Sequence, residues 1–241
     1  MTKCEDEKKD RIIAALDVDD LILAEKLVEQ LKDIIKIFKV GNQLFTAAGP
    51  ESIKMVTDKG GQVFLDLKFH DIPNTVAQAA QAATEQKVFM FNVHASGGSK
   101  MMRSAVRASH QKALQTGEQR PIILGVTVLT SSDEKELKEL GINRTVKDQV
   151  VYLTELARES RLDGVVCSAQ EIELIRPTAG QGFVIVTPGI RPAWSETNDQ
   201  KRIMTPAQAF EKGADYIVVG RPITAAPDPA AAARRIIDEL E

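Results

Sequence analysis

Eight short apolar runs recur along the chain, and each is followed by a segment with helical character. Runs of four to nine such residues between glycine, proline and polar residues are typical of buried strands. Strict alternation of strand and helix predicts a parallel sheet, because parallel neighbours need a crossover connection. Eight such units in 241 residues fit an α/β fold of one domain, a (β/α)8 TIM barrel, usually about 250 residues long. The runs are 12–16, 35–40, 63–69, 88–93, 121–129, 164–168, 183–186 and 215–219.

The alternative architecture is a doubly wound open sheet. No G-x-G-x-x-G fingerprint follows the first run, so the barrel is the better interpretation. We expect residues 1–10 to form a flexible or capping N-terminal tail and residues 11–241 to form the barrel. Gly41 is expected to end the second strand. The expected helices are 20–31, 50–58, 76–86, 99–114, 133–140, 146–160, a short one ending near 175, 206–212 and 229–240.

Composition excludes several classes of protein. The formal net charge is −3, which argues against a general nucleic-acid binder. The two cysteines, Cys4 and Cys167, match no zinc or disulfide pattern, and Cys167 is expected to be a small core residue. No apolar run approaches the roughly 18 residues of a membrane span. The polar start, MTKCEDEKKD, lacks the apolar segment of a signal peptide, so we expect a cytoplasmic protein that does not bind membranes.

The stretch 63–75, VFLDLKFHDIPNT, places three charges in and beside an apolar strand. Side chains alternate along a strand, so Asp66 and Lys68 are predicted to share one face with Phe64. Asp71 follows just beyond the strand. Charges inside an apolar strand are costly unless they are paired, hydrogen-bonded or used in function. We favour function, and the alternative is a structural pair of Asp66 with Lys68.

Polar residues also stand at the ends of other predicted strands. The carboxyl ends of the strands form the active site in (β/α)8 barrels, so these side chains are expected to converge. Each has an alternative: Asp17 can cap a helix, Lys39 can extend to solvent, and His94 can be structural, which we slightly favour for that residue. The residues concerned are Asp17, Lys39, Asp66, Lys68, His94, Thr130 and Gly220 with Arg221.

The loops after the seventh and eighth strands are predicted to bind phosphate. Glycine lets the backbone approach an anion, and the planar guanidinium of arginine matches its oxygens. The polar stretch 187–202 is long enough to be a mobile lid hinged at Pro188-Gly189. For Arg221 the alternative is a surface salt bridge. The candidate residues are Gly189, Arg191, Gln200, Gly220 and Arg221.

The segment DLKFHDIPNT resembles the signature of the orotidine 5′-monophosphate decarboxylase family. The D-x-K-x-x-D array alone is shared with a wider suprafamily of phosphosugar enzymes, whereas the array followed by I-P-N-T is specific. The resemblance extends over essentially the whole chain, through ALDVDD, KVG, VTVLTS, TPGIRP and VVGRPIT. It implies decarboxylation of orotidine 5′-monophosphate to uridine 5′-monophosphate, the last step of de novo pyrimidine biosynthesis, without metal or cofactor.

The resemblance also implies roles for individual residues. Lys68 is implied as the proton donor, within a charge network of Asp66, Asp71 and Lys39. Asp17 and Lys39 are implied to hold the ribose, and Thr130, with Ser131 beside it, to lie near the pyrimidine ring. Asp71 and Thr75 are implied to reach the active site of a second subunit, which makes the protein a homodimer with shared sites. The residues implied to bind the 5′-phosphate are Arg191, Gln200, Gly220 and Arg221.

The chemistry is consistent with the residues. Loss of CO₂ from C6 leaves an in-plane carbanion that the ring does not delocalise, and the sequence has no sign of a cofactor to act as an electron sink. A cationic Lys68 would stabilise and protonate that carbanion. The first rival is a metal-dependent suprafamily relative, which usually has a glutamate where this chain has Lys39. The second rival is a catalytically silent nucleotide-binding barrel, which would be expected to lack Lys68 or Asp71.

Overall fold

Parallel strands form a closed barrel in sequence order, from β1 next to β2 round to β8 next to β1. The computed structural model describes residues 10–195 and 204–240. The predicted barrel is therefore confirmed, and most strand boundaries agree with the expected ranges to within two residues. The strands are β1 (Ile12–Ala15), β2 (Ile37–Gly41), β3 (Gln62–Phe69), β4 (Met90–His94), β5 (Ile122–Val126), β6 (Gly164–Val166), β7 (Val184–Thr187) and β8 (Tyr216–Val219).

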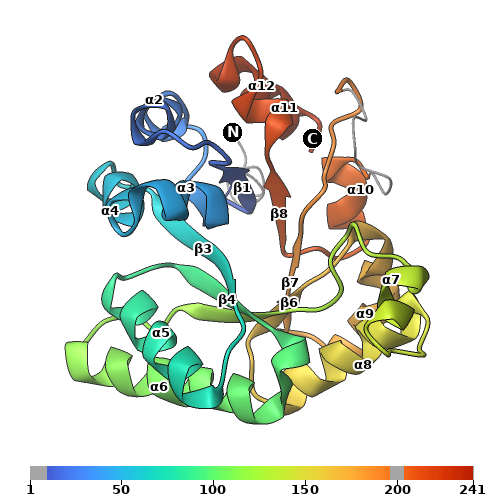
Figure 1. Ribbon diagram of the computed structural model, residues 1–241. Coiled ribbons are helices and arrows are strands. Elements are labelled where there is room, and N and C mark those ends of the chain that lie inside the picture. The colour runs from blue at the N-terminus through green and yellow to red at the C-terminus, as the bar shows by residue number, and fades with distance from the viewer. Residues whose placement is uncertain (1–9, 196–203, 241) are drawn as a thin grey trace.

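Helices surround the strands, as the ribbon shows (Figure 1). Several begin at capping residues that the sequence indicates: Asp20 accepts a hydrogen bond from Ile22 N at the start of α2, and Asp228 caps α12 in the same way. The helices are α2 (Leu21–Leu31), α3 (Asn42–Ala48), α4 (Glu51–Asp58), α5 (Pro73–Glu85), η1 (Ala95–Gly97), α6 (Gly98–Thr116), α7 (Glu134–Glu139), α8 (Val146–Glu159), η2 (Ala169–Glu171), α9 (Ile172–Ala179), α10 (Pro206–Glu211), α11 (Arg221–Thr224) and α12 (Pro229–Asp238).

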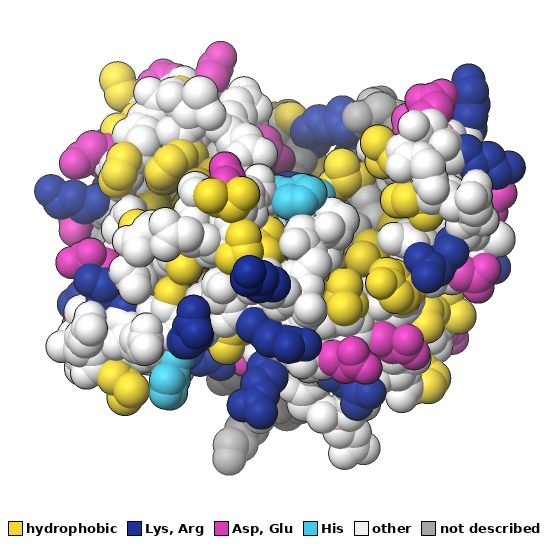
Figure 2. Space-filling view, turned by 60° about the horizontal axis from the view of Figure 1, so that its bottom comes forward, with side chains coloured by type: hydrophobic (Ala, Val, Ile, Leu, Met, Phe, Trp, Pro, Cys, Tyr) yellow, Lys and Arg dark blue, Asp and Glu magenta, His cyan; other side chains and the backbone are white. Residues whose placement is uncertain are grey.

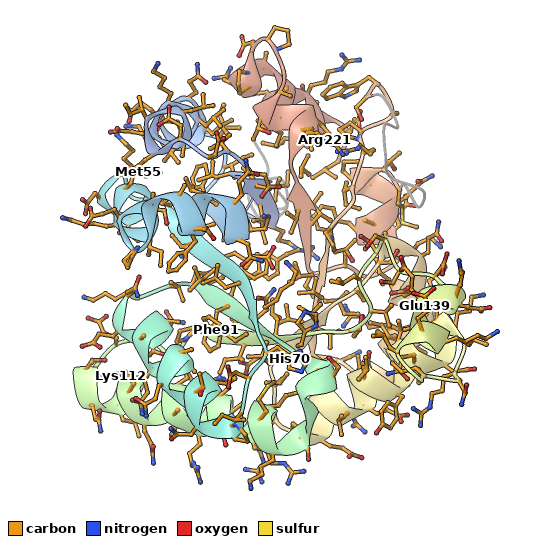
Figure 3. All side chains as sticks on the ribbon, viewed as in Figure 1. Met55, His70, Phe91, Lys112, Glu139 and Arg221 are labelled. Carbon is orange, nitrogen blue, oxygen red and sulfur yellow. The ribbon has the colours of Figure 1, made fainter. Side chains whose placement is uncertain are left out.

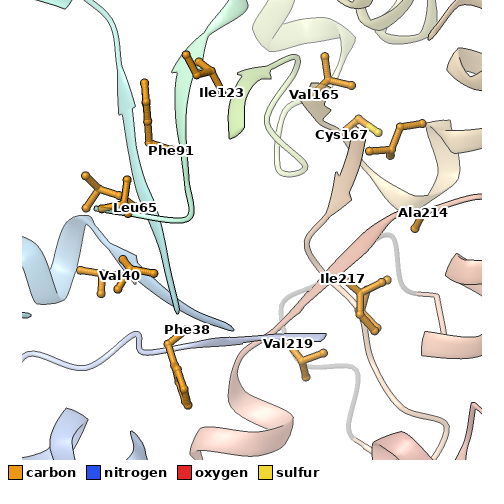
Figure 4. Packing of buried hydrophobic residues seen from close by; sticks show 14 of the residues in the cluster. Phe38, Val40, Leu65, Phe91, Ile123, Val165, Cys167, Ala214, Ile217 and Val219 are labelled. Carbon is orange, nitrogen blue, oxygen red and sulfur yellow. The ribbon is translucent and has the colours of Figure 1, made fainter. Parts of the chain in front are cut away.

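The hydrophobic core has two layers, because side chains alternate along each strand. One layer fills the barrel and draws on all eight described strands, with Ile13, Phe64 and Val218 among its members. The other layer lies between the strands and the helices. Figure 4 shows members of this outer layer, such as Phe38 and Phe91, pointing away from the barrel interior.

Helices α5 and α6 pack closely against each other on one side of the barrel (Figure 1). Between them Thr84 Oγ1 and Ser109 Oγ lie 2.8 Å apart, and both side chains are fully buried. The 19 residues of α6 include no Asp or Glu, and Lys100, Arg103 and Arg107 are exposed on it. Figure 2 shows Lys and Arg side chains gathered on the face that includes these helices. The charge of the molecule is therefore unevenly distributed.

Strand β2 ends at Gly41, as expected, and this glycine pairs with Asp66. Some other local expectations are wrong. Strand β5 ends at Val126 rather than 129, and Val128 and Leu129 line a cavity. Helix α9 continues through Pro177 to Ala179, past the expected end near 175. Helices α3 and α11 were not expected, because each follows a glycine that favours a loop.

Candidate active site

Four charged side chains at the ends of β1, β2 and β3 form a continuous array with alternating sign. Lys39 Nζ lies 2.6 Å from Asp17 Oδ1 and 3.5 Å from Asp66 Oδ2. Lys68 Nζ lies 2.7 Å from Asp66 Oδ1. The side chains of Lys39 and Asp66 are only 10% and 13% exposed, so each charge needs its neighbours to offset the loss of solvent. The structure thus brings these four predicted residues together.

The backbone of Lys68 is irregular. Its φ angle is 53°, which is in the left-handed region that non-glycine residues rarely adopt. Pairing of β3 with β4 changes register here: Leu65 lies opposite Phe91, but Phe69 lies opposite Val93. Three residues of β3 therefore lie opposite one residue of β4, which is a β-bulge. The regular alternation predicted for β3 does not extend through Lys68, although Lys68 still contacts Asp66.

Asn92 on β4 is part of the array, and sequence reasoning missed it. Its side chain is fully buried, its Nδ2 donates to Asp66 Oδ1 at 2.6 Å, and its Oδ1 accepts from Lys68 N at 2.8 Å. The available signal was an amide inside the otherwise apolar run VFMFNV, since buried polar groups are nearly always hydrogen-bonded for a reason.

A cavity of about 230 Å³ opens beside the array. Its charged end has Lys39, Asp66 and Lys68, and Thr130 with Ser131 lies on its wall. The structure thus places Thr130 on the same cavity as three of the charged residues. The rest of the lining is mainly apolar and includes inner-barrel side chains, so the cavity suits a ligand with an apolar part and a polar or charged edge. The other lining residues are Phe64, Val126, Val128, Leu129, Val166, Cys167, Pro188 and Val218.

Gly41 leaves room for the Lys39 ammonium, and Gly220 lies near Asp17. A Cβ at Gly41 would lie 2.8 Å from Lys39 Nζ, closer than real Cβ contacts, so a side chain there would displace the ammonium group. A Cβ at Gly220 would lie 3.7 Å from Asp17 Oδ2. The end of β8 therefore lies beside the Asp17 end of the array.

The loops predicted to bind phosphate follow the neighbouring strands β7 and β8. Gly189 has a φ of 77°, and Arg191 is buried with its N–H donating to Met204 O at 3.0 Å. Arg221 is exposed at the start of α11. Figure 3 shows Arg221 on the α11 side of the strands and His70 on the α6 side. Gln200 and residues 196–202 of the expected lid lie outside the described residues, as do residues 1–9 of the expected tail.

Asp71 and Thr75 are exposed and do not join the array of their own chain. Asp71 Oδ1 instead accepts a hydrogen bond from the next backbone N–H, at 2.6 Å, just before α5. Ile72 between them is 66% exposed, which is high for a large apolar side chain. Among the described ion pairs, none joins Asp71 to Lys68.

His94 ends β4 and stacks on His70, with ring centroids 5.4 Å apart. Burial lowers the pKa of His94 below its ordinary 6.5, and the positive charges of His70 and Lys68 lower it further. His94 is not among the described residues that line the cavity, and its structural role stays a prediction. Cys167 is fully buried in the core, as expected, and burial strongly raises the pKa of its thiol.

Within residues 10–195 and 204–240, no three His, Cys, Asp or Glu side chains gather in a way that could hold a metal ion. No helix in these ranges has the length and apolar character needed to cross a membrane.

Comparison with known proteins identifies similar chains over almost the full length. The family model described as Orotidine 5′-phosphate decarboxylase / HUMPS family matches residues 10–236. The orotidine 5′-phosphate decarboxylase of Moorella thermoacetica is 56% identical over 97% of this chain and 93% of its own length. That of Syntrophotalea carbinolica is 51% identical over 97% of this chain and 96% of its own. The crystal structure of the Lactobacillus acidophilus protein of that name superposes with a TM-score of 0.84 at 40% identity, covering 96% and 99% of the two chains.

Proposed function

The chain belongs to the orotidine 5′-phosphate decarboxylase / HUMPS family and is a decarboxylase, and we propose that it converts orotidine 5′-monophosphate to uridine 5′-monophosphate and CO₂. This reaction is the last step of de novo pyrimidine biosynthesis. The observation that carries the proposal is the array of Asp17, Lys39, Asp66 and Lys68 at the charged end of a mainly apolar cavity. A pyrimidine ring with a carboxylate on one edge is complementary to such a cavity.

The proposed chemistry centres on Lys68. The bond from C6 to the carboxylate breaks, CO₂ leaves, and the electron pair stays on C6 in the plane of the ring. The Lys68 ammonium stabilises this developing charge and then donates a proton to C6, after which Lys68 regains a proton from solvent. The contact of Lys68 Nζ with Asp66 Oδ1 at 2.7 Å supports this role, because the carboxylate holds the ammonium group at the charged end of the cavity.

Asp66 has a second proposed effect. Its carboxylate would lie near the substrate carboxylate, and two like charges in a partly buried site repel each other. Departure of CO₂ removes that repulsion, so the ground state is disfavoured relative to the transition state. Asp66 is hydrogen-bonded to Asn92 and Lys68, which supports the proposal because it limits how far the carboxylate can withdraw.

The remaining parts of the substrate are assigned along the same edge of the barrel. We propose that Asp17 and Lys39 bind the ribose hydroxyls and that Thr130, with Ser131, lies against the pyrimidine. The binding energy of the phosphate would help to place the ring. The proposed phosphate ligands are Arg191, Gln200, Gly220 and Arg221.

The nearest alternative within the wider suprafamily is a metal-dependent reaction of a sugar phosphate. Lys39 argues against it, because its ammonium lies 2.6 Å from Asp17 and 3.5 Å from Asp66 and would repel a divalent cation there. A reaction independent of metal is therefore the better match to these side chains.

The test is the change in ultraviolet absorbance of orotidine 5′-monophosphate on addition of the purified protein, with and without EDTA. We expect rapid conversion that EDTA does not affect and that the Lys68→Ala variant loses. Conversion abolished by EDTA would contradict the metal-free mechanism. No conversion by folded protein would favour a sugar-phosphate substrate or a binding role.

A further inference from the structure

We infer that Asn92 is a positioning residue, which holds Asp66 and the backbone of Lys68 in their working geometry through one side-chain amide. This inference rests on the proposed function, since it assigns Asn92 to the same site. Nothing in the D-x-K-x-x-D signature includes this residue, which lies on the neighbouring strand β4.

The amide of Asn92 closes a ring of contacts. Asn92 Nδ2 donates to Asp66 Oδ1 at 2.6 Å, and Asn92 Oδ1 accepts from Lys68 N at 2.8 Å. Lys68 Nζ then donates to the same Asp66 Oδ1 at 2.7 Å. A carboxylate only accepts hydrogen bonds and a backbone N–H only donates, so these two neighbours fix the orientation of the amide.

The β-bulge explains why an amide is needed at this position. Three residues of β3 lie opposite Asn92. Lys68 N is therefore out of register with the backbone acceptor that it would face in a regular strand pair. The side chain of Asn92 supplies the missing acceptor. A left-handed backbone at a non-glycine residue persists only where its surroundings hold it, and it commonly marks a functional site.

Asn92 is also well placed to be rigid. It is fully buried, and its own strand pairs with β5 through Asn92 opposite Leu124. Asp66, by contrast, has one oxygen facing Lys39 and one facing Lys68, so a partial turn of its carboxylate plane would lengthen both contacts. The hydrogen bond from Asn92 holds that plane and so helps to determine where the Lys68 ammonium lies.

Two variants of the full chain test this inference. In Asn92→Ala the amide is lost, and we expect kcat to fall about 100-fold with a much smaller change in KM, because misplacing a reacting group costs this much. In Asn92→Asp the shape is kept, but a second carboxylate faces Asp66. A proton shared between the two carboxylates would restore the donor, so the ratio of variant to wild-type kcat should rise as pH falls from about 8 to about 6.

A matched control is Ser109→Ala, which removes a buried hydroxyl from the α5/α6 contact and leaves Thr84 bonded to Ala80 O. We expect it to keep wild-type kcat. Wild-type kcat in both Asn92 variants would overturn the inference, and so would a kcat ratio for Asn92→Asp that does not vary with pH.

Hydrogen exchange at the Lys68 backbone amide gives a readout independent of activity. We expect faster exchange in Asn92→Ala than in the wild type, relative to the neighbouring β3 amides. Unchanged protection would overturn the inference even if the protein proved to have another substrate. An inactive wild type with the expected loss of protection would instead contradict the proposed function alone.

Discussion

At the scale of single residues, Lys39 has the most buried charged side chain of the array. Its ammonium lies between two carboxylates, and its side chain is 10% exposed, whereas that of Asp17 is 51% exposed. Removing one partner from a buried charge group leaves the others uncompensated, while removing an exposed partner costs little. The two ends of the same ion pair should therefore respond differently to substitution.

For Lys39→Met we expect the free energy of unfolding to fall by about 2 kcal/mol, because the buried Asp66 loses one of its two cationic neighbours and keeps only Lys68. For Asp17→Asn we expect a loss below about 1 kcal/mol, because much of that carboxylate faces water. Urea denaturation monitored by circular dichroism measures both. Equal losses in the two variants would show that the burial difference does not govern the stability of the array.

His94 should make stability depend on pH. Its folded-state pKa is lowered below 6.5, mainly by burial, so the folded state disfavours the protonated form. The contribution of neutral His94 to the free energy of unfolding is fully present above the unfolded-state pKa. It is lost as pH falls through that value toward the folded-state pKa. His94→Asn should flatten the decline in unfolding free energy below about pH 6.5. A decline as steep as in the wild type would show that other groups cause it. The control is His70→Asn, because His70 is a smaller cause of the lowered His94 pKa than burial.

The residues that sequence reasoning located are those at predicted strand ends. Asp17, Lys39, Asp66, Lys68 and Thr130 could be grouped because the active site of a barrel lies at the carboxyl ends of its strands, although the bulge in β3 breaks the alternation predicted for Lys68. Asn92 could not be assigned a role in this way, because its partners depend on the register between β3 and β4. Register is a property of two strands, and neither strand's own sequence reports it.

At the scale of elements, the errors in the sequence prediction occur at glycine and proline residues, which can either end regular structure or lie directly before or within a helix. Gly41 and Gly220 look like strand or loop ends, yet each leads directly into a short helix, α3 and α11. Pro177 lies inside α9, whose end comes at Gly180 with a φ of 77°. Local propensity predicts these residues to be breaks in regular structure, and packing around the barrel decides whether a helix follows.

The end of α8 offers a prediction at this scale. Arg161 follows the C-cap Ser160, is exposed, and has a φ of 65°, a conformation usually occupied by glycine after a helix. Arg161→Gly should raise the free energy of unfolding by about 1 kcal/mol, because it removes the steric cost of the left-handed backbone. Thermal or urea unfolding measures the gain, and Arg161→Ala, which keeps a Cβ, should show none. A gain of the same size in Arg161→Ala would attribute the effect to the charge.

At the scale of the whole molecule, the position of Asp71 and Thr75 bears on assembly. Both are exposed beside Ile72, and neither contacts the array described in its own chain. We propose that they complete the active site of a second copy in a homodimer. A partner subunit at this position would also cover the exposed apolar Ile72.

Mixing variants in dimers of known composition tests this proposal. A dimer of Lys68→Ala with Asp71→Ala would contain one site with both residues intact. After random exchange of subunits, about half of the dimers are mixed and about half of the sites in these are intact. The mixture should therefore regain about a quarter of wild-type activity. The double variant Lys68→Ala/Asp71→Ala sharpens the test. Paired with wild type in a shared-site dimer it leaves no intact site, whereas with both residues from one chain the wild-type site would survive. Loss of wild-type activity on mixing with the double variant therefore requires shared sites, and its retention in verified mixed dimers would contradict them.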